Sequence, residues 1–503
     1  MFIFHGIYKE LILFFLLLQL RFFVALTSKT FFQPDEYWQS LEPAHQFVYG
    51  YGYLTWEWRE GIRDFTHPFI FSIVYWLLKL TKYDSPYLII IFPKLLQAIF
   101  AAISDFYTIK LSLKLHNERV SLWTLFIVIT SPFNVFFGYR TFSNTLETVF
   151  IICALYYWPL NFKNSQRKEL RFSLIFTSIA CALRPTNILI LLFLLGCLFF
   201  CGNFKFIFDV FIIGSISFLF LFLLNFYYYN RWTLPLIKFL KFNLIDGLSV
   251  YYGSSPWHYY LFQGLPILLF LYLPFGFHGA YLHRKTIYFW LIVFVLFCYS
   301  MIQHKEIRFI YFLSPLLYIF SAKSISHVPM FIIKKIVLLI LIINVIVIWY
   351  INQVHQRGVI DVMGYIRNNL DVTGVIFLMP CHSTPWQSYV HRPDIQMRFL
   401  TCEPLISLHQ NNVSIKYRDE ADLFYDNPYL FLQKYFVYEN FNSTLQNGFF
   451  WPSHFVFFEN LLTIIDSHVS ILGYKECARF FNSHFIDDWR RKGDVIVYCK
   501  KQI

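Results

Sequence analysis

The sequence predicts a polytopic α-helical membrane protein with about eleven transmembrane helices, followed by a C-terminal α+β domain. The 503 residues are 57% hydrophobic and 14% charged, with a mean hydropathy of +0.49. Soluble domains are about 45–50% apolar and about 25% charged. Apolar runs separated by short polar connections fill residues 1–352, and the composition becomes mixed over residues 353–503. These observations exclude a single soluble enzyme and a disordered chain.

The net charge of +12 comes entirely from the hydrophobic part of the chain. From Val354 onward there are 14 basic and 15 acidic residues, which leaves 28 basic against 15 acidic residues before it. Basic residues between apolar spans follow the positive-inside rule. The charge therefore indicates topology, and we expect no nucleic-acid partner.

The first apolar run, Leu11–Leu26, follows Lys9 and is not followed by a small-x-small cleavage site. An uncleaved signal anchor is therefore favoured over a cleaved signal peptide. Such runs can cross a bilayer core of ~30 Å if they tilt slightly or the bilayer thins. The other expected spans lie near 86–109, 119–139, 142–161, 171–186, 187–202, 205–229, 260–282, 286–303, 309–325 and 336–352.

Basic connections between these runs predict the orientation of the chain in the membrane. The four connections placed in the cytosol are Lys110–Arg119, Lys163–Arg171, Arg284–Lys285 and Lys323–Lys335. The loops then placed in the lumen are 28–66, the turn at Arg140, the Arg184-Pro185 break, 230–259 and His304–Arg308. This scheme requires that residues 67–83 are re-entrant or interfacial. An odd number of spans puts the N-terminus in the cytosol and the C-terminal domain in the lumen.

Two further features support a lumenal C-terminal domain at residues 353–503. Asn412 and Asn442 each begin a glycosylation sequon. Four of the nine cysteines lie in this domain, an even number that suits an oxidising compartment. These disulfide candidates, for which three connectivities are possible, are Cys381, Cys402, Cys477 and Cys499. The terminal Lys500-Lys501-Gln502-Ile503 resembles a cytosolic retrieval signal, and we interpret it as the end of a strand.

The C-terminal domain contains two stretches typical of strands, Gly374–Met379 and Val495–Cys499, both rich in β-branched residues. Pro380, Pro385, Pro393 and Pro404 mark loops in the same domain.

The first lumenal loop holds the densest group of ionisable residues, and such residues are costly beside a bilayer. Asp35 and Glu36 follow Pro34 and open an amphipathic helix that runs towards Gly50. Taken alone, the two carboxylates are explained by a structural role, because acidic residues in the first turn cap a helix and interact favourably with its dipole. Apolar surroundings would also raise the pKa of a carboxylate and make it a general base.

Other lumenal clusters carry charge together with aromatic rings. Trp56, Glu57 and Trp58, followed by Arg63, are either membrane-belt anchors or a surface that binds sugar. Arg140, Asn144 and Glu147 share a face if that stretch is helical. Arg184 precedes Pro185 at a break where freed backbone groups line a cavity.

The hairpin His304-Lys305-Glu306 with Arg308 is either a solvated turn or a phosphate site, because Arg offers a fork and Lys a point charge. The 230–259 loop adds Tyr252, Trp257 and His258 on the same side. No Walker loop, Rossmann fingerprint, zinc spacing or nucleophile elbow is present in the sequence. Together the clusters predict a lumenal site with a carboxylate base, a phosphate clamp and aromatic surfaces that bind sugar.

Five ordered segments resemble the dolichol-phosphate-mannose-dependent mannosyltransferases of glycosyltransferase family 22, in the GT-C superfamily. They are Phe32–Glu36, Leu54–Trp58, Arg140–Thr141 with Asn144 and Glu147, Arg184–Thr186, and His304–Glu306 with Arg308–Phe309. Three tail segments resemble the branch that extends the GPI-anchor precursor: Met379–Pro385, Met397–Leu400 and Asp419–Asp422. Asp64 departs from the pattern, because a small hydroxyl residue is expected there.

The resemblance implies a GT-C-type fold in the membrane of the endoplasmic reticulum. It implies transfer of the third mannose, in α-1,2 linkage, from dolichyl phosphate mannose to the GPI precursor. The expected base is Asp35, or else Glu36, and the expected phosphate clamp is His304, Lys305 and Arg308. The remaining cluster residues are expected to bind substrate. We expect no metal and no other cofactor, and the sequence indicates no required protein partner. A sister enzyme of N-glycan precursor assembly and a polytopic transporter are the alternatives; the chain lacks the paired broken helices of the latter.

Overall fold

The structure, a computed structural model, describes residues 6–159, 167–200, 206–242, 253–403, 418–436 and 449–500. The chain forms two compact units. The first comprises Met1–Thr27, Glu57–Val74 and Ile91–Trp349, and the second Ser28–Trp56, Tyr75–Ile90 and Tyr350–Ile503. From the sequence, a single boundary is expected after residue 352. In the structure the second unit resumes at Tyr350 and also contains most of the first expected lumenal loop.

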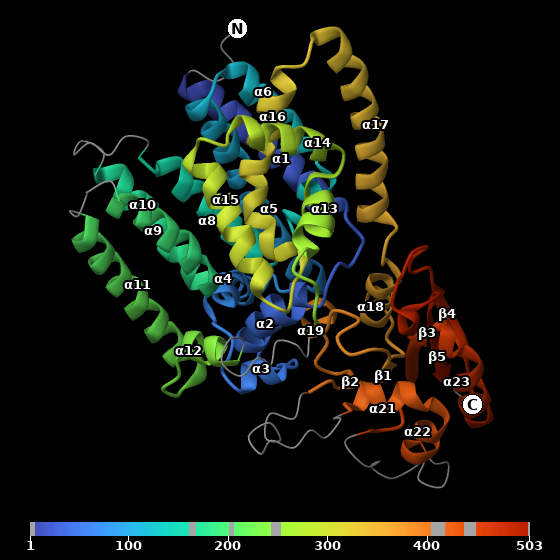
Figure 1. Ribbon diagram of the computed structural model, residues 1–503. Coiled ribbons are helices and arrows are strands. Elements are labelled where there is room, and N and C mark those ends of the chain that lie inside the picture. The colour runs from blue at the N-terminus through green and yellow to red at the C-terminus, as the bar shows by residue number, and fades with distance from the viewer. Residues whose placement is uncertain are drawn as a thin grey trace. The chain divides into compact units, whose positions relative to one another are not determined.

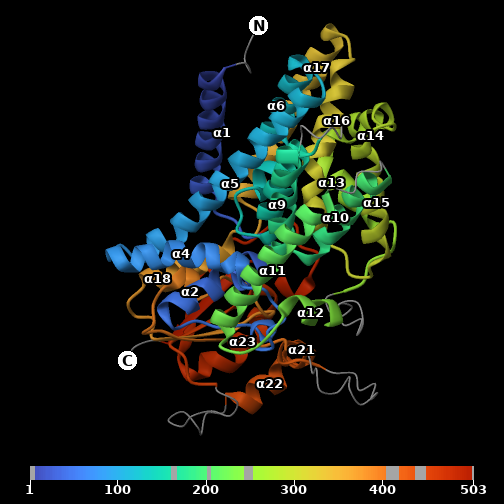
Figure 2. The same ribbon diagram turned by 90° about the vertical axis from the view of Figure 1, so that its left-hand side faces the viewer.

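Most of the first unit is helical (Figures 1 and 2). Its pairs α8 with α9, α14 with α16, and α6 with α16 pack against each other. The helices up to residue 353 are α1 Ile7–Thr27, α2 Glu42–Tyr49, α3 Trp56–Arg59, α4 Thr66–Thr81, α5 Pro86–Leu115, α6 Glu118–Thr130, α7 Pro132–Phe137, α8 Ser143–Tyr157, α9 Arg167–Leu183, α10 Ile188–Phe200, α11 Phe206–Tyr229, α12 Pro235–Leu240, α13 Leu265–Leu269, α14 Leu273–Leu282, α15 Ile287–Met301, α16 Ser314–Ser326 and α17 Met330–Gln353. Tighter or wider turns precede some of them: η1 Tyr37–Leu41, η3 Pro185–Asn187, η6 Tyr260–Gly264, η7 Phe270–Tyr272 and η8 Ile307–Leu313.

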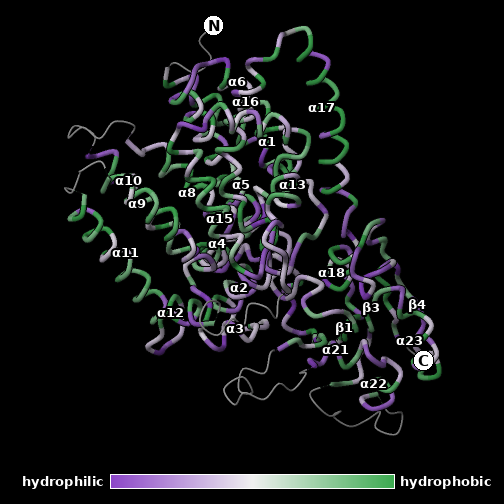
Figure 3. The backbone as a smooth tube through the Cα atoms, in the orientation of Figure 1, coloured by the Kyte–Doolittle hydropathy of each residue, from purple (hydrophilic) through white to green (hydrophobic). Residues whose placement is uncertain are grey.

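Six helical stretches in the described part of the chain are long and apolar enough to cross a membrane. They are Ile7–Thr27, Pro86–Leu115, Phe206–Tyr229, Tyr260–Leu282, Ile307–Ser326 and Phe331–Asn368. Pro185–Phe200 and Ile287–Met301 are apolar but shorter. Figure 3 shows hydrophobic colouring over most of α11 and α17, interrupted by a few hydrophilic residues. The protein is thus a multi-pass membrane protein, and the count of eleven spans stays a prediction.

The other expected apolar runs do not form a helix long and apolar enough to cross a membrane, because prolines divide them or because their helices are short. The run 119–139 is divided at Ser131, because Pro132 has no amide hydrogen and begins α7. The Arg184-Pro185 break is present as expected, with η3 joining α9 to α10. Residues 67–83 contain α4, which is shorter than the six candidate spans. The re-entrant or interfacial placement of this helix stays a prediction.

The second unit contains a five-stranded mixed sheet in the order β2-β1-β3-β5-β4. Its strands are β1 Gly374–Leu378, β2 Gln396–Phe399, β3 His454–Phe458, β4 Tyr474–Phe480 and β5 Val495–Lys500. β2, β1 and β3 run parallel, whereas β5 pairs antiparallel with β3 and β4. The two predicted strands are confirmed as β1 and β5. The dilysine stretch begins at the end of β5, in line with its interpretation as the end of a strand.

The core of this sheet is aromatic, with Phe424, Phe431, Phe455, Phe457 and Tyr474 in one buried cluster. Helices α18 Gly358–Asn368, α21 Glu420–Asp426, α22 Pro428–Tyr435 and α23 Leu462–Val469 flank the strands, and α19 Gln387–Val390 forms one turn after β1. Disulfides join Cys381 to Cys402 and Cys477 to Cys499. Of the three possible connectivities, this is the one that pairs cysteines close in the sequence. Asn412 and Asn442 lie outside the described residues.

Candidate active site

The two proposed base residues lie at the start of a helical stretch that ends at Gly50, as predicted. Glu36 is buried and Asp35 half-buried, and Pro34 directly precedes them. The first turns are wide: the Glu42 amide donates to the Tyr37 carbonyl in the π-helical segment η1. Pro43, which has no amide hydrogen, interrupts the regular ladder just beyond it. Wide turns of this kind occur frequently at functional sites.

Residues 57–66 belong to the first unit and are held against α11 and α12, where Lys238 donates to the Glu60 carbonyl at 2.6 Å. Asn225 donates to Asp64 at 2.6 Å and accepts from the Phe65 amide at 3.1 Å. The Tyr229 hydroxyl donates to the Arg63 carbonyl at 2.6 Å. Asp64, the residue that departs from the family pattern, therefore anchors this segment to α11.

The aromatic and charged residues of this segment are mostly enclosed. Trp58 is 2% exposed, and its ring lies edge-on to Phe65 and Tyr228. Its packing stabilises the segment, whereas a residue that stacks on a sugar presents an open ring face. Glu57 accepts a hydrogen bond from Arg63 at 2.6 Å, and Arg63 is the more exposed of the pair. Trp56 is buried and lies in the second unit.

Arg140 does not share a helix with Asn144 and Glu147. The helix α8 begins at Ser143, so Arg140 lies in the preceding turn and the expected common face does not include it. Its buried guanidinium lies 4.2 Å from the centre of the Phe136 ring. The face was expected because the spacing fits a helix, but Pro132 starts a separate short helix, α7, that ends before Arg140.

Arg184 instead joins Asn144 and Glu147. Its Nη1 donates to Asn144 Oδ1 at 3.3 Å, and its Nε lies 3.2 Å from Glu147 Oε2. Its guanidinium also lies 5.1 Å from the centre of the Phe309 ring. Two clusters that the sequence presents separately thus form one buried polar group next to the hairpin at residues 303–309.

Glu306 organises that hairpin. Arg308 donates to its carboxylate through Nε and Nη2, both at 2.7 Å, and His304 Nε2 lies 3.1 Å from it. Burial alone would raise the pKa of Glu306, but the charges and hydrogen bonds of Arg308 and His304 hold that pKa well below its usual range. Glu306 is part of the cluster expected from the sequence, but no role was predicted for it. Its position two residues from both His304 and Arg308 was the available signal.

The aromatic loop lies against the same hairpin, as the shared lumenal assignment predicted. Lys305 Nζ donates to the Ser255 carbonyl at 2.9 Å, and His304 Nδ1 lies 3.1 Å from the Gly253 carbonyl. Burial lowers the pKa of Lys305. Trp257 is 66% exposed, with His258 edge-on to it, and Tyr252 lies outside the described residues. The first unit therefore offers a basic hairpin beside an open aromatic side chain.

Residues 12–391 match the family model described as the Alg9-like mannosyltransferase family. This chain belongs to the Alg9-like mannosyltransferase family. Among similar proteins, a GPI mannosyltransferase 3 of Yarrowia lipolytica is 43% identical over 481 residues, which is 94% of each chain. A GPI alpha-1,2-mannosyltransferase 3 of Mus musculus is 37% identical, over 96% of this chain and 88% of its own.

Solved structures support the fold expected for this Alg9-like chain. ArnT from Cupriavidus metallidurans, bound to undecaprenyl phosphate, aligns over 98% of both chains with a TM-score of 0.59 and 12% identity. The Archaeoglobus fulgidus oligosaccharyltransferase in its apo form aligns over 98% of this chain and 76% of its own, with a TM-score of 0.51 and 13% identity. The Alg9-like chain therefore shares its overall fold with these two proteins.

Proposed function

We propose that this chain transfers the third mannose, in α-1,2 linkage, from dolichyl phosphate mannose to the GPI-anchor precursor. Relatives that match almost the whole chain at 36–43% identity are named GPI mannosyltransferase 3 or GPI alpha-1,2-mannosyltransferase 3, which supports the α-1,2 linkage and the GPI acceptor. These names favour the GPI precursor over the alternative, the N-glycan precursor, as the acceptor.

The reaction is a single inverting displacement. The acceptor hydroxyl oxygen forms a bond to C1 of mannose while the bond from C1 to the phosphate oxygen breaks. The hydroxyl proton passes to Asp35 or Glu36, and dolichyl phosphate leaves with the bonding electron pair. The general base contributes to the rate by taking this proton as the new bond forms.

The phosphate assignment is supported by the arrangement of His304 and Arg308 around Glu306, with Lys305 in the same hairpin. The carboxylate holds two of the basic side chains in fixed orientations before the substrate arrives. Groups fixed in advance need no reorganisation as charge develops on the leaving phosphate. The net positive charge of the hairpin neutralises the phosphate, so the proposal requires no metal ion.

The remaining candidate residues have supporting roles in this proposal. Arg184, with Asn144 and Glu147, forms the buried group next to the hairpin. Trp257, with His258, presents the open aromatic surface for the acceptor glycan. We place the reaction at the lumenal face of the endoplasmic reticulum, with the N-terminus in the cytosol and the second unit in the lumen.

Lipid analysis after depletion of the protein tests this function. The proposal predicts that a GPI precursor with two mannoses accumulates and that re-expression of the protein clears it. Accumulation of a truncated N-glycan precursor with a normal GPI precursor would instead support the sister enzyme. Normal levels of both would support the transporter alternative.

A further inference from the structure

The segment that carries Asp35 and Glu36 lies on the C-terminal part of the second unit. The amides of Lys29 and Phe31 donate to the carbonyls of Asn352 and Gln356, at 3.0 and 3.1 Å. The Tyr37 ring stacks on Phe31 and lies edge-on to Tyr389 of α19. Backbone pairing and ring packing thus fix this segment on both sides of the carboxylate pair.

Trp38 anchors the segment to a loop of the C-terminal part. This loop, residues 379–391, connects β1 to the region before β2 and is called the docking loop below. Trp38 is 2% exposed, and its Nε1 donates to the Thr384 carbonyl at 2.9 Å. Its ring centre lies 4.4 Å from that of His382 and 5.7 Å from that of Trp386. A large enclosed ring with a satisfied N–H holds two chain segments together strongly.

Glu42 makes the second attachment. Its Oε2 accepts from the Ser388 amide at 2.8 Å, and its Oε1 accepts from the amides of Gln387 and Tyr53, at 3.2 and 3.3 Å. Burial raises the pKa of Glu42 to about 7, although these amides favour the ionised form. Backbone amides can only donate, so both side-chain oxygens are needed as acceptors. A Cβ at Gly52 would lie 2.7 Å from Oε1, so a glycine is required beside this carboxylate.

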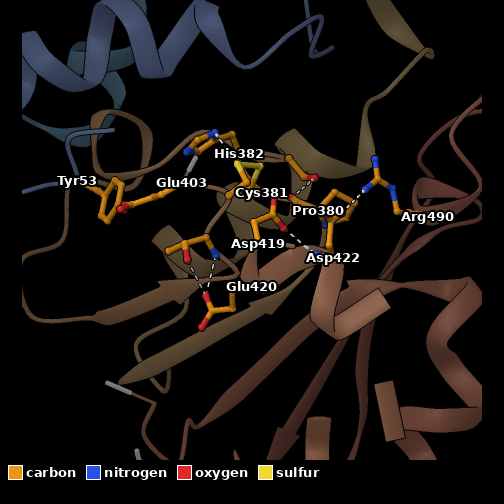
Figure 4. Close-up of a disulfide and its surroundings, with 12 residues drawn as sticks. Tyr53, Pro380, Cys381, His382, Glu403, Asp419, Glu420, Asp422 and Arg490 are labelled. Atoms are coloured by element: carbon orange, nitrogen blue, oxygen red, sulfur yellow. Dashed lines mark hydrogen bonds and ion pairs between the residues drawn. A yellow bond between two sulfur atoms is a disulfide. The ribbon is translucent and has the colours of Figure 1, made fainter. Parts of the chain in front are cut away.

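The disulfide between Cys381, in the docking loop, and Cys402, beyond β2, closes a larger loop that contains most of the docking loop; it lies next to His382 and Glu403 (Figure 4). Tyr53, which follows the helical stretch, donates to Glu403 at 2.7 Å. His382 has a left-handed backbone with φ of 57°. Burial lowers the pKa of His382 to about 4, and the Asp35 carboxylate opposes this shift. The residue beside the disulfide therefore lies within electrostatic reach of the proposed base.

We propose that the disulfide-linked docking loop positions Asp35 and Glu36 for catalysis, with Trp38 and Glu42 as the positioning residues. The proposal rests on the proposed function, because it concerns the same base. Misplacement of a reacting group by about 1 Å costs on the order of 10²-fold in rate. The disulfide is then needed for turnover, beyond its contribution to the stability of the domain.

The second disulfide provides a matched control. Cys381–Cys402 and Cys477–Cys499 have sequence separations of 21 and 22 residues. Loops of nearly equal length have nearly equal closure entropy in the unfolded chain. Cys477 lies on β4, where the Tyr365 hydroxyl is 3.7 Å from its Sγ, and Cys499 lies on β5, where it pairs with His454 and Lys475. All of these partners lie outside residues 28–56. The double variants C381S/C402S and C477S/C499S should therefore lose comparable stability. Only C381S/C402S removes a disulfide from the loop that contacts the segment of Asp35 and Glu36.

The experiment compares these two variants as full-length protein in lipid nanodiscs, below the melting temperature of each. Hydrogen exchange over residues 31–49 and the kinetic constants for dolichyl phosphate mannose are measured. We expect C381S/C402S to exchange at least about tenfold faster over residues 31–49 and to lose on the order of 10²-fold in kcat, with an unchanged donor KM. We expect C477S/C499S to change both quantities less than about twofold.

Glu42→Gln is the complementary test in the intact disulfide framework. The new amide group would face an amide N–H, so exchange over residues 31–49 should rise and kcat should fall while the disulfides remain formed. Equal exchange in the two cysteine variants, or equal kcat, would overturn the proposal. Failure of the proposed function would look different: the unmodified protein would transfer no mannose to the GPI precursor, while the exchange difference between the variants would persist.

Discussion

Arg308 uses two nitrogens of its guanidinium to bind the carboxylate of Glu306, two residues before it. The two hydrogen bonds fix the orientation of the Arg308 guanidinium before any ligand arrives. Glu306 is therefore an acidic residue that belongs to the basic hairpin. The fixed charges that meet a phosphate there are those of Lys305 and Arg308 less that of the Glu306 carboxylate.

Removal of the basic groups should weaken donor binding as well as turnover, because the donor phosphate is charged in the ground state too. We expect Lys305→Ala and Arg308→Ala each to raise the donor Kd about 10- to 100-fold, the equivalent of one charge-assisted hydrogen bond. Arg308→Lys should rescue only in part, because the fork is lost. A donor-binding assay with purified variants measures this effect.

Arg284→Ala is the matched control, since this exposed arginine donates to the Tyr281 carbonyl in a different connection. It removes the same charge and should leave the donor Kd unchanged. Normal donor binding by both Lys305→Ala and Arg308→Ala would show that the hairpin is a solvated turn.

The ion pairs of the hairpin should persist in moderately acidic solution. The pKa of Glu306 is lowered in the folded protein, so its contribution to stability is fully present above the ordinary glutamate pKa. That contribution is lost as the pH falls through the lowered, folded-state pKa. The difference in melting temperature between the unmodified protein and Glu306→Gln should therefore stay constant from pH 8 to about pH 5 and shrink only in stronger acid. A difference that shrinks already between pH 7 and pH 5 would contradict this reading of the hairpin.

Loss of the general base should have different kinetic effects from loss of the phosphate clamp. Asp35→Asn keeps shape and hydrogen bonding but removes basicity, so kcat should fall on the order of 10²–10⁴-fold while donor binding persists. Initial rates and donor affinity of the folded variant measure the two effects. Near-normal turnover would move the role to Glu36, which is the more deeply buried carboxylate of the pair.

The topology predicts that Asn412 and Asn442 receive lumenal glycans. Endoglycosidase should shift the mobility of the protein, and Asn→Gln changes at both positions should abolish the shift. A tag after Ile503 should resist protease in sealed microsomes. Digestion of that tag without detergent would place the second unit in the cytosol.

The sequence predicted the structure best where a residue type has a high free-energy cost in its surroundings, as a charged residue has near a bilayer. Apolar runs and basic connections located the helices, because charge is expensive inside a bilayer. The same reasoning singled out the hairpin His304–Arg308, whereas the 230–259 loop was singled out by its aromatic residues. The structure brings the two into contact through Lys305 and Ser255. The helix after Pro34 and the strands β1 and β5 followed from local patterns.

The partners of individual charges could not be predicted, because they depend on how distant segments fold together. Arg184 pairs with Asn144, 40 residues away, and Glu42 with the Ser388 amide, 346 residues away. Arg140 fell outside the expected face because the chain turns before α8 begins. The grouping of residues 28–56 with the C-terminal part had no local signal, since it rests on backbone pairing such as that of Lys29 with Asn352.

The most direct test of the central claim is mannose transfer by the purified protein from dolichyl phosphate mannose to a GPI precursor that carries two mannoses. The account predicts a product with one additional mannose in the α configuration, which an α-1,2-specific exomannosidase removes. No transfer to this acceptor, or a product that resists the exomannosidase, would contradict the account.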